Sequence, residues 1–205
     1  GFIGLGLVEL DLERAIDCLN AYVTEPGDPH TAFIHHGSPV PVQFYLFLEI
    51  WNRCQDRRLL AHFYPRLRQY YLFLSGQLGS STTRSLRSNL LKTWDYFYNS
   101  GGWDDYPPQV HVHRHGLEAR VTPVVTTAQC IRIAKILSMM ARAQGLQEDI
   151  SGYQRDIELL ARALQEHAWD EDSGYFSYVV HDDSGQPLCH LVHESGKNYN
   201  RGLDG

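Results

Sequence analysis

The sequence has no closely spaced pair of cysteines. Its four cysteines, Cys18, Cys54, Cys130 and Cys189, are scattered along the chain, whereas zinc knuckles and dithiol redox motifs need two cysteines a few residues apart. The cysteine pattern therefore gives no indication of a metal or redox centre. Two disulfides would be possible, but we interpret these residues as scattered buried thiols.

Long apolar runs are also absent. No run reaches the ~20 residues that span a bilayer, so we expect no membrane span. The first segment, Gly1–Leu10, has neither a starting methionine nor a basic leader, and the chain ends abruptly at Arg201–Gly205. We therefore expect a piece of a longer protein.

The chain has no excess of positive charge. Eighteen Lys and Arg stand against 24 Asp and Glu, for a net charge of -6, which weighs against nucleic acid as the main partner. No glycine-rich phosphate loop and no alternation of strands and helices is present, so nothing indicates a nucleotide-binding fold. Apolar residues make up 43% of the chain, enough for the core of one domain or a large piece of one.

Helical patterns alternate with loops along the chain. Apolar residues recur at helical spacing, and capping residues mark several starts and stops. Pro65 would interrupt one helix as a kink or a fresh start, while Thr122 would cap another with Pro123 at its first position. The predicted helices are Asp11 to Val23, Val42 to Arg53, Asp56 to Leu74, Pro123 to Gln144 and Ile150 to Ala168. Leu90 to Tyr98 would lead into the aromatic-rich segment that contains the motif.

Two short strands, Tyr175–Val180 and Leu188–Val192, flank a turn at Asp182–Gln186. We therefore predict an all-α fold with one small β-hairpin. Its antiparallel helix pairs would form part of an (α/α)6 toroid. A complete toroid needs on the order of 350–450 residues, so residues 1–205 would form part of a single catalytic domain. The remainder of the same enzyme would then be needed to close the ring.

Chemistry concentrates in the aromatic-rich segment Thr93–Pro108, which also contains three Asp, two Gly and two Pro. Gly101 and Gly102 let the backbone bend sharply, and Trp103 can offer its ring to a sugar face. A carboxyl beside such surface loses hydration, so its pKa rises and it can stay protonated. That property suits a general acid for glycosidic cleavage. Residue types alone fit a helix-initiating Asp pair at least as well.

The stretch Ser100-Gly-Gly-Trp-Asp-Asp-Tyr-Pro107 resembles the Ser-Gly-Leu-Asp-Asp-Tyr-Pro-Arg stretch of glycoside hydrolase family 63, the processing α-glucosidase I group. Its Gly-Trp-Asp core is also similar to the Ser-Gly-Trp-Asp of trehalases. The resemblance implies that Asp104, directly after the hydrophobic residue, is the general acid. An extra Gly stands in this chain, and Pro108 replaces the family's Arg, which puts any substrate contact by that Arg, and the sugar specificity, in doubt. Trp169–Phe176 resembles a hairpin common in helical-toroid glycosidases.

The same resemblance implies an inverting mechanism with a Glu as general base near the barrel's C-terminal end. Glu194 is the tempting match, but the residues that follow it resemble a stretch well before the family's base. We therefore interpret Glu194 as a surface loop residue and expect the base outside this chain.

Three histidines, His111, His113 and His115, stand at alternate positions. On an extended strand they would share a face and could bind zinc, but no cysteine or suitably spaced carboxylate completes a site. We favour a polar loop near the cleft and expect no metal. His30, His35 and His36 would border the same cleft as loop or capping residues.

The sequence thus predicts an α-glucosidase-like glycosidase that needs no cofactor and acts on a carbohydrate substrate. Asp104 would be the catalytic acid, and Asp105 would hold a sugar hydroxyl or position Asp104. The cleft would also contain the aromatic residues Trp94, Tyr96, Trp103 and Tyr106. The alternative is a non-catalytic carbohydrate-binding module of helical-repeat type, whose aromatic residues stack on sugars without hydrolysis.

Overall fold

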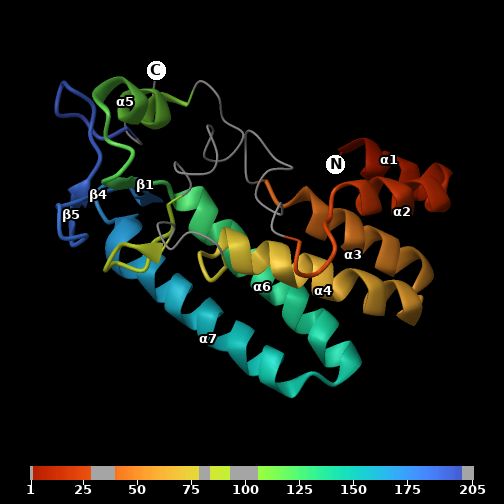
Figure 1. Ribbon diagram of the computed structural model, residues 1–205. Coiled ribbons are helices and arrows are strands. Elements are labelled where there is room, and N and C mark those ends of the chain that lie inside the picture. Colours follow the sequence, from red (N-terminus) through yellow and green to blue (C-terminus); the bar gives the residue numbers. More distant parts are fainter. Residues whose placement is uncertain (1, 29–39, 79–83, 93–105, 200–205) are drawn as a thin grey trace.

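The computed structural model describes residues 2–28, 40–78, 84–92 and 106–199, and Figure 1 shows how their elements are arranged. Within these residues the chain forms seven α-helices, one π-helical turn and five short strands. In chain order they are α1 (Phe2–Leu10), α2 (Leu12–Ala21), α3 (Val42–Cys54), α4 (Arg57–Leu74), α5 (Pro107–His115), β1 (Val121–Thr122), α6 (Val124–Gln144), α7 (Gln147–Ala163), η3 (Leu164–Ala168), β2 (Trp169–Asp170), β3 (Tyr175–Phe176), β4 (Val179–His181) and β5 (Pro187–His190).

Short connections join α1 to α2, α3 to α4 and α6 to α7. The carboxylates of Asp11 and Asp56 accept hydrogen bonds from the backbone N–H of Arg14 (3.2 Å) and Arg58 (2.8 Å), which fixes the starts of α2 and α4. Gly145, with φ +74°, ends α6 in the left-handed conformation. Because so few residues separate the two helices of each of these pairs, the second helix turns back along the first, as the sequence predicts for helix pairs.

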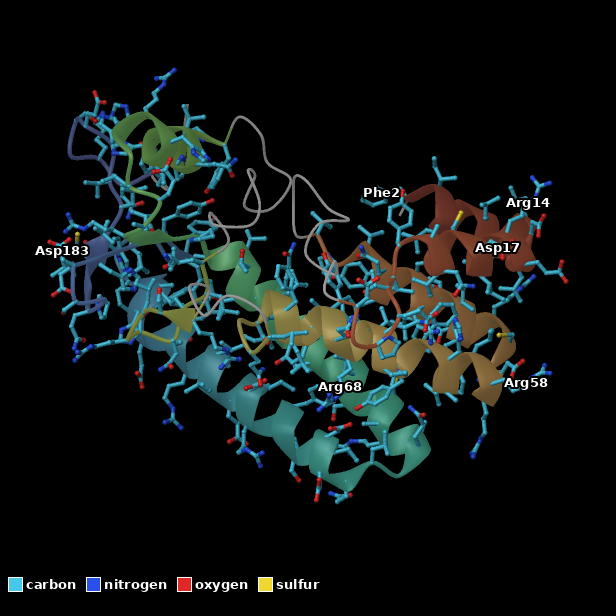
Figure 2. The ribbon with its side chains drawn as sticks, in the orientation of Figure 1. Phe2, Arg14, Asp17, Arg58, Arg68 and Asp183 are labelled. Carbon is cyan, nitrogen blue, oxygen red and sulfur yellow. The ribbon has the colours of Figure 1, made fainter. Side chains whose placement is uncertain are left out.

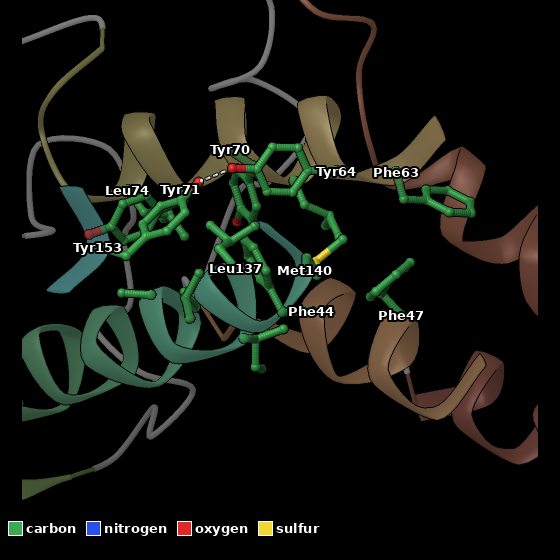
Figure 3. Packing of buried hydrophobic residues seen from close by; sticks show 14 of the residues in the cluster. Phe44, Phe47, Phe63, Tyr64, Tyr70, Tyr71, Leu74, Leu137, Met140 and Tyr153 are labelled. Carbon is green, nitrogen blue, oxygen red and sulfur yellow. Dashed lines mark hydrogen bonds between the residues drawn. The ribbon is translucent and has the colours of Figure 1, made fainter. Parts of the chain in front are cut away.

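Helices α1–α4, α6 and α7 form what we call the helical body. Its core is built from aromatic and aliphatic side chains of α3, α4 and α6, which interlock in Figure 3. Phe44 is fully buried and stacks on Tyr70 with ring centroids 6.0 Å apart. The stripe of apolar residues on each helix therefore meets the stripes of its neighbours, which is the main source of stability in such a body.

A polar seam joins α4 to α7 beside this core. The hydroxyls of Tyr64 and Tyr71 donate to Asp149 (2.6 Å) and Asp156 (2.5 Å). Arg68 extends from α4 toward α7 in Figure 2 and lies 3.3 Å from Asp149. Burial raises the pKa of both tyrosines above its usual range, so they stay protonated as donors to the two carboxylates.

Helix α6 runs through the centre of the body. By length and composition it is one helix that could cross a membrane, and 56% of the window concerned is buried inside the protein. It packs against α4 on one side and α7 on the other. Its apolar character is therefore accounted for by its central place in the core.

The opposite end of the molecule, which we call the sheet end, comprises residues 106–122 and 169–199. Strands β1, β4 and β5 form an antiparallel sheet in that order, and β2 pairs with β3 in a separate two-stranded ribbon. The turn at Asp182–Gln186 is confirmed, because the Asp182 carboxylate accepts from the backbone N–H of both Ser184 (2.9 Å) and Gln186 (2.8 Å). Figure 1 shows α5 lying beside this sheet, away from α1 and α2.

Several local predictions were wrong. Helix α1 was not predicted, and the predicted strand Tyr175–Val180 is divided between two sheets. Thr122 lies in β1, while Pro123 caps α6. Helix α4 is continuous through Pro65, so no fresh start occurs there. Proline removes one backbone donor from a helix, but the buried aromatic face around this residue holds α4 together.

The cysteine prediction was half right. All four thiols are free. Cys130 is fully buried, and burial raises the pKa of its thiol to about 12, while Cys18 is partly buried. Cys54 and Cys189 are exposed, because they occupy the last position of α3 and the outer side of an edge strand. The predicted toroidal arrangement of the helix pairs stays a prediction.

Candidate functional site

The segment that precedes the motif is fixed against the N-terminal end of α6. The backbone N–H of Leu91 donates to the hydroxyl of Thr127 on α6 (3.0 Å), and the following residue, Lys92, is buried. On the other side of residues 93–105, Tyr106 lines a pocket together with Val124 and Val125, the first residues of α6. The described residues before and after positions 93–105 therefore lie at the same end of the same helix.

A buried histidine strengthens the first of these anchors. His181 bonds the hydroxyl of Ser88 through Nε2 (2.8 Å) and the carbonyl of Arg120 through Nδ1 (3.1 Å). Since the carbonyl can only accept, the proton lies on Nδ1, and Nε2 accepts from Ser88. Burial lowers the pKa of His181, so this neutral ring ties the segment before the motif to strand β4.

The predicted site residues Trp94, Tyr96, Trp103, Asp104 and Asp105 lie outside the described residues. The predicted loop histidines His30, His35 and His36 lie outside them as well. Of the predicted site, Tyr106 alone is within the described part of the chain, where it stands directly before α5.

Tyr106 ends the motif and begins a helix that was not predicted. Its carbonyl accepts the backbone N–H of Val110 (3.0 Å), and Pro107 and Pro108 occupy the first helical positions, where no backbone donor is needed. Gly116, with φ +62°, ends the helix. The two prolines and this glycine are standard boundary signals, so the sequence did contain the information for α5.

Tyr106 forms one wall of an apolar pocket with a volume of about 160 Å³. Its ring meets that of Tyr178 edge to face, with centroids 5.9 Å apart. The other lining residues come from α5, α6, the strands and the last described segment: Pro108, Val124, Val125, Phe176, Ser177, Leu191 and Tyr199. Burial raises the pKa of Tyr106, which reflects how poorly this wall is hydrated.

A second pocket, with a volume of about 240 Å³, lies on the other side of Tyr199. We call it the histidine pocket, and it is lined by Pro107, Val110, His111, Arg114, His115, His193, Glu194 and Tyr199. Because α5 is a helix, His111 and His115 stand one turn apart with ring centroids 4.3 Å apart. His113 instead pairs with Glu118 (3.0 Å). The predicted polar loop was therefore wrong, because these three histidines lie on a helix.

Tyr199 connects the two pockets. Its hydroxyl bonds Nδ1 of His111 at 2.7 Å, and its ring lines both cavities. The preceding residue, Asn198, donates to the buried carboxylate of Asp170 and forms a bridge with Val192. No motif indicated Tyr178 or Tyr199 in advance, because each reaches Tyr106 or α5 from a segment some 70 or more residues away in sequence.

Among the described residues, no three His, Cys, Asp or Glu side chains are arranged to hold a metal ion. Glu194 is exposed and lies 3.0 Å from Nε2 of His115. This position matches the interpretation of Glu194 as a surface loop residue.

Comparison with known proteins gives one family. Residues 41–197 match the bacterial alpha-L-rhamnosidase 6 hairpin glycosidase domain; no curated protein matches the chain. The match covers about three quarters of the sequence, from the start of α3 to the segment before Tyr199. It includes the motif, every residue of the two pockets except Tyr199, and most of the helical body. The hairpin architecture of the described helices agrees with this match. The chain therefore belongs to the bacterial α-L-rhamnosidase six-hairpin glycosidase domain family.

Proposed function

We propose that this chain carries the general acid of an inverting glycoside hydrolase, and that the acid is Asp104. The observation that supports the proposal is the anchoring of the chain on both sides of residues 93–105. Leu91 bonds Thr127 near the N-terminal end of α6, and Tyr106 lines the apolar pocket together with Val124 and Val125 at the same end. Membership of a glycosidase domain family supports the same class of reaction.

The pocket offers the environment that a proton donor needs. A carboxyl next to Tyr106, Tyr178 and Val124 would lose part of its hydration, and the loss penalises the charged form. Its pKa would rise, so the acid would hold its proton near neutral pH. The raised pKa of Tyr106, caused by the same burial, supports this view.

In the reaction that we propose, Asp104 donates its proton to the glycosidic oxygen as the bond to the anomeric carbon breaks. A glutamate outside this chain takes a proton from a water molecule, which attacks the opposite face of the sugar. Inverting enzymes keep the two carboxyl groups ~6.5–9.5 Å apart to leave room for that water. Asp105, Trp94, Tyr96, Trp103 and Tyr106 would bind the sugar.

Two sugars are candidates for the cleaved residue. The family is named for α-L-rhamnoside cleavage, and rhamnose carries a methyl group where glucose carries a hydroxymethyl group. The lining of the apolar pocket, with Pro108, Val124 and Leu191, favours the methyl group because it needs no hydrogen-bond partner. The likeness of Ser100–Pro107 to the α-glucosidase I group favours an α-glucoside instead.

The enzyme should be assayed in a form that includes the glutamate base, with p-nitrophenyl α-L-rhamnoside and p-nitrophenyl α-D-glucoside, together with disaccharides of each sugar. Asp104→Asn should lower turnover of the disaccharides by about 10²–10⁴-fold, the usual contribution of general acid catalysis. Asp105→Asn should raise KM at least as much as it lowers kcat. Asp17→Asn, at an exposed position on α2 that Figure 2 labels, is the matched control and should change nothing.

Proton NMR of the first product should show the anomer opposite to that of the substrate. If Asp104→Asn keeps more than about a tenth of the wild-type turnover, the acid is another residue. Binding of either sugar by the wild-type protein without any turnover would favour the non-catalytic carbohydrate-binding module.

A further inference from the structure

The histidine pocket presents hydrogen-bond donors far in excess of acceptors. Nδ1 of His111 bonds the Tyr199 hydroxyl at 2.7 Å. Nδ1 of His193 accepts the backbone N–H of Ser195 (3.1 Å), which puts the proton of its neutral ring on Nε2. Both rings therefore use Nδ1 within the protein, and a bound carboxylate would favour the forms that carry a proton on Nε2.

His115 adds a third imidazole to the lining. Its Nδ1 donates to the carbonyl of His111 (2.9 Å). Its Nε2 lies 3.0 Å from a carboxylate oxygen of Glu194. The pocket therefore already places a carboxylate beside an imidazole nitrogen, which is the position that the carboxylate of a ligand would take.

Arg114 adds a permanent charge to the same lining. Within the described part of the chain, no carboxylate lies within ion-pair distance of its guanidinium. Among the described residues, Glu194 is the one carboxylate that lines the pocket, and its side chain is 67% exposed. Such an exposed pair adds little to stability, so another carboxylate can replace Glu194 beside His115 at little cost.

The rest of the lining suits a sugar ring. Tyr199, Pro107 and Val110 offer apolar surface next to the donors, and an aromatic ring can pack on the C–H face of a pyranose. Tyr199 also lines the apolar pocket, so a sugar here would lie next to one bound there.

We propose that the histidine pocket binds the carboxylate of a sugar acid, with His111, His115, His193 and Arg114 as donors and Glu194 as the internal group that it displaces. The assignment of this sugar to the position next to the cleaved bond rests on the proposed function. The binding itself does not, and it can be measured without turnover.

The test is an NMR titration of the histidine Cε1–H resonances of the purified protein with D-glucuronate. D-glucose has the same ring without the charge, and acetate has the charge without the ring. Glucuronate should shift the resonances of His111, His115 and His193 and bind more tightly than either control compound. Equal binding of glucuronate and glucose would overturn the proposal. Equal binding of glucuronate and acetate would reduce the site to a general anion site and overturn its assignment to a sugar.

Two variants should act in opposite directions. His115→Gln removes the imidazole and should weaken glucuronate binding by about tenfold, as expected for the loss of a hydrogen bond to a carboxylate. Glu194→Gln removes the competing carboxylate and should tighten it. His62→Gln, at a histidine of α4 that bonds Asn20 in the helical body, is the matched control and should leave the affinity unchanged. Weaker binding by Glu194→Gln would mean that Glu194 holds the pocket in shape instead of blocking it, and would overturn the displacement.

The histidine pocket should bind glucuronate more tightly at lower pH. The titratable and charged groups facing His111 are His115, His193, Arg114, Glu194 and Tyr199. Burial and the two neighbouring imidazoles lower the pKa of His111, so this ring gains its second proton only below its usual range. A bound carboxylate stabilises that proton, so glucuronate affinity should rise as pH falls from 7.5 to about 5.5, a range around the ordinary histidine pKa of ~6.5. An affinity that falls over this range would overturn the proposed donor set.

Discussion

The helical body and the sheet end are held together in different ways. In the body, a continuous cluster of buried aliphatic and aromatic residues spans α1–α4, α6 and α7. At the sheet end, four buried residues, Val112, Val121, Tyr178 and Leu191, form a separate small cluster. Around that cluster stand the histidines and both pockets. The difference indicates that stability resides in the body and recognition at the end, since binding residues generally sit on less regular segments held by a rigid core.

The largest expected effect comes from a substitution that opens a cavity in the core of the helical body, which tests whether stability resides there. Phe44→Ala should reduce the free energy of unfolding by about 3–5 kcal/mol, as is usual for a buried phenylalanine. Chemical denaturation measures the loss. Hydrogen exchange should show weakened protection across α3, α4 and α6 together. Protection lost at α5 alone would contradict the assignment of the main core to the body.

A comparable cavity at the sheet end should lower the free energy of unfolding by less, and it should disturb only the neighbouring elements. Val112 is fully buried on α5, and Val112→Ala removes two carbons, each worth ~0.8 kcal/mol, plus a small cavity, for about 2 kcal/mol. Hydrogen exchange should speed up in α5 and β1 and remain unchanged in α3 and α4. An equal effect in both regions would show that the two clusters unfold as one.

Low pH should weaken the contact by which His181 ties the segment before the motif to strand β4. His181 has a lowered pKa in the folded protein, so the unfolded state binds a proton first as pH falls below the ordinary value of ~6.5. The stability from neutral His181 is therefore present above that pH and lost as pH falls toward the lowered folded pKa, by at most about 1.4 kcal/mol per pH unit. Denaturation curves from pH 7.5 to 5 should show a shallower decline for His181→Asn than for wild type. Identical declines would assign the pH dependence to other groups.

The smallest expected effect concerns the hydroxyl that joins the two pockets. Tyr199→Phe removes its hydrogen bond to His111 and should cost about 1 kcal/mol. The pKa of His111, measured by NMR titration, should change because Nδ1 loses its partner, while the ring of residue 199 still fills the wall of the apolar pocket. An unchanged His111 resonance would mean that the bond is not formed in solution.

Much of the helical body was predictable from sequence, because its signals are local. Asp56 caps α4 through a donor two residues away, and Gly145 ends α6 by its own conformation. The turn after β4 is likewise decided by Asp182 and its next few neighbours. Helix α5 was missed although Pro107 and Gly116 mark its ends, because the histidine-rich segment was interpreted as a polar loop.

The candidate site was predictable only in part. The resemblance predicts Asp104 as the acid, which stays a prediction, while Tyr106, predicted from the aromatic-rich segment, does line a pocket. The opposite wall, Tyr178 and Tyr199, had no local signal, because its place depends on the pairing of β4 with β1 and on the bond between Asn198 and Asp170.

By itself, the sequence determined where most helices start and stop, which faces are apolar and which segment carries the carboxyls. These properties depend on residues a few positions apart, where backbone geometry and capping decide the outcome. Tertiary structure alone decided that His111, His193 and Tyr199 share one pocket and that Cys54 is exposed. Such outcomes depend on which surfaces the chain buries against each other, and contacts between distant segments are not encoded in any short stretch of sequence.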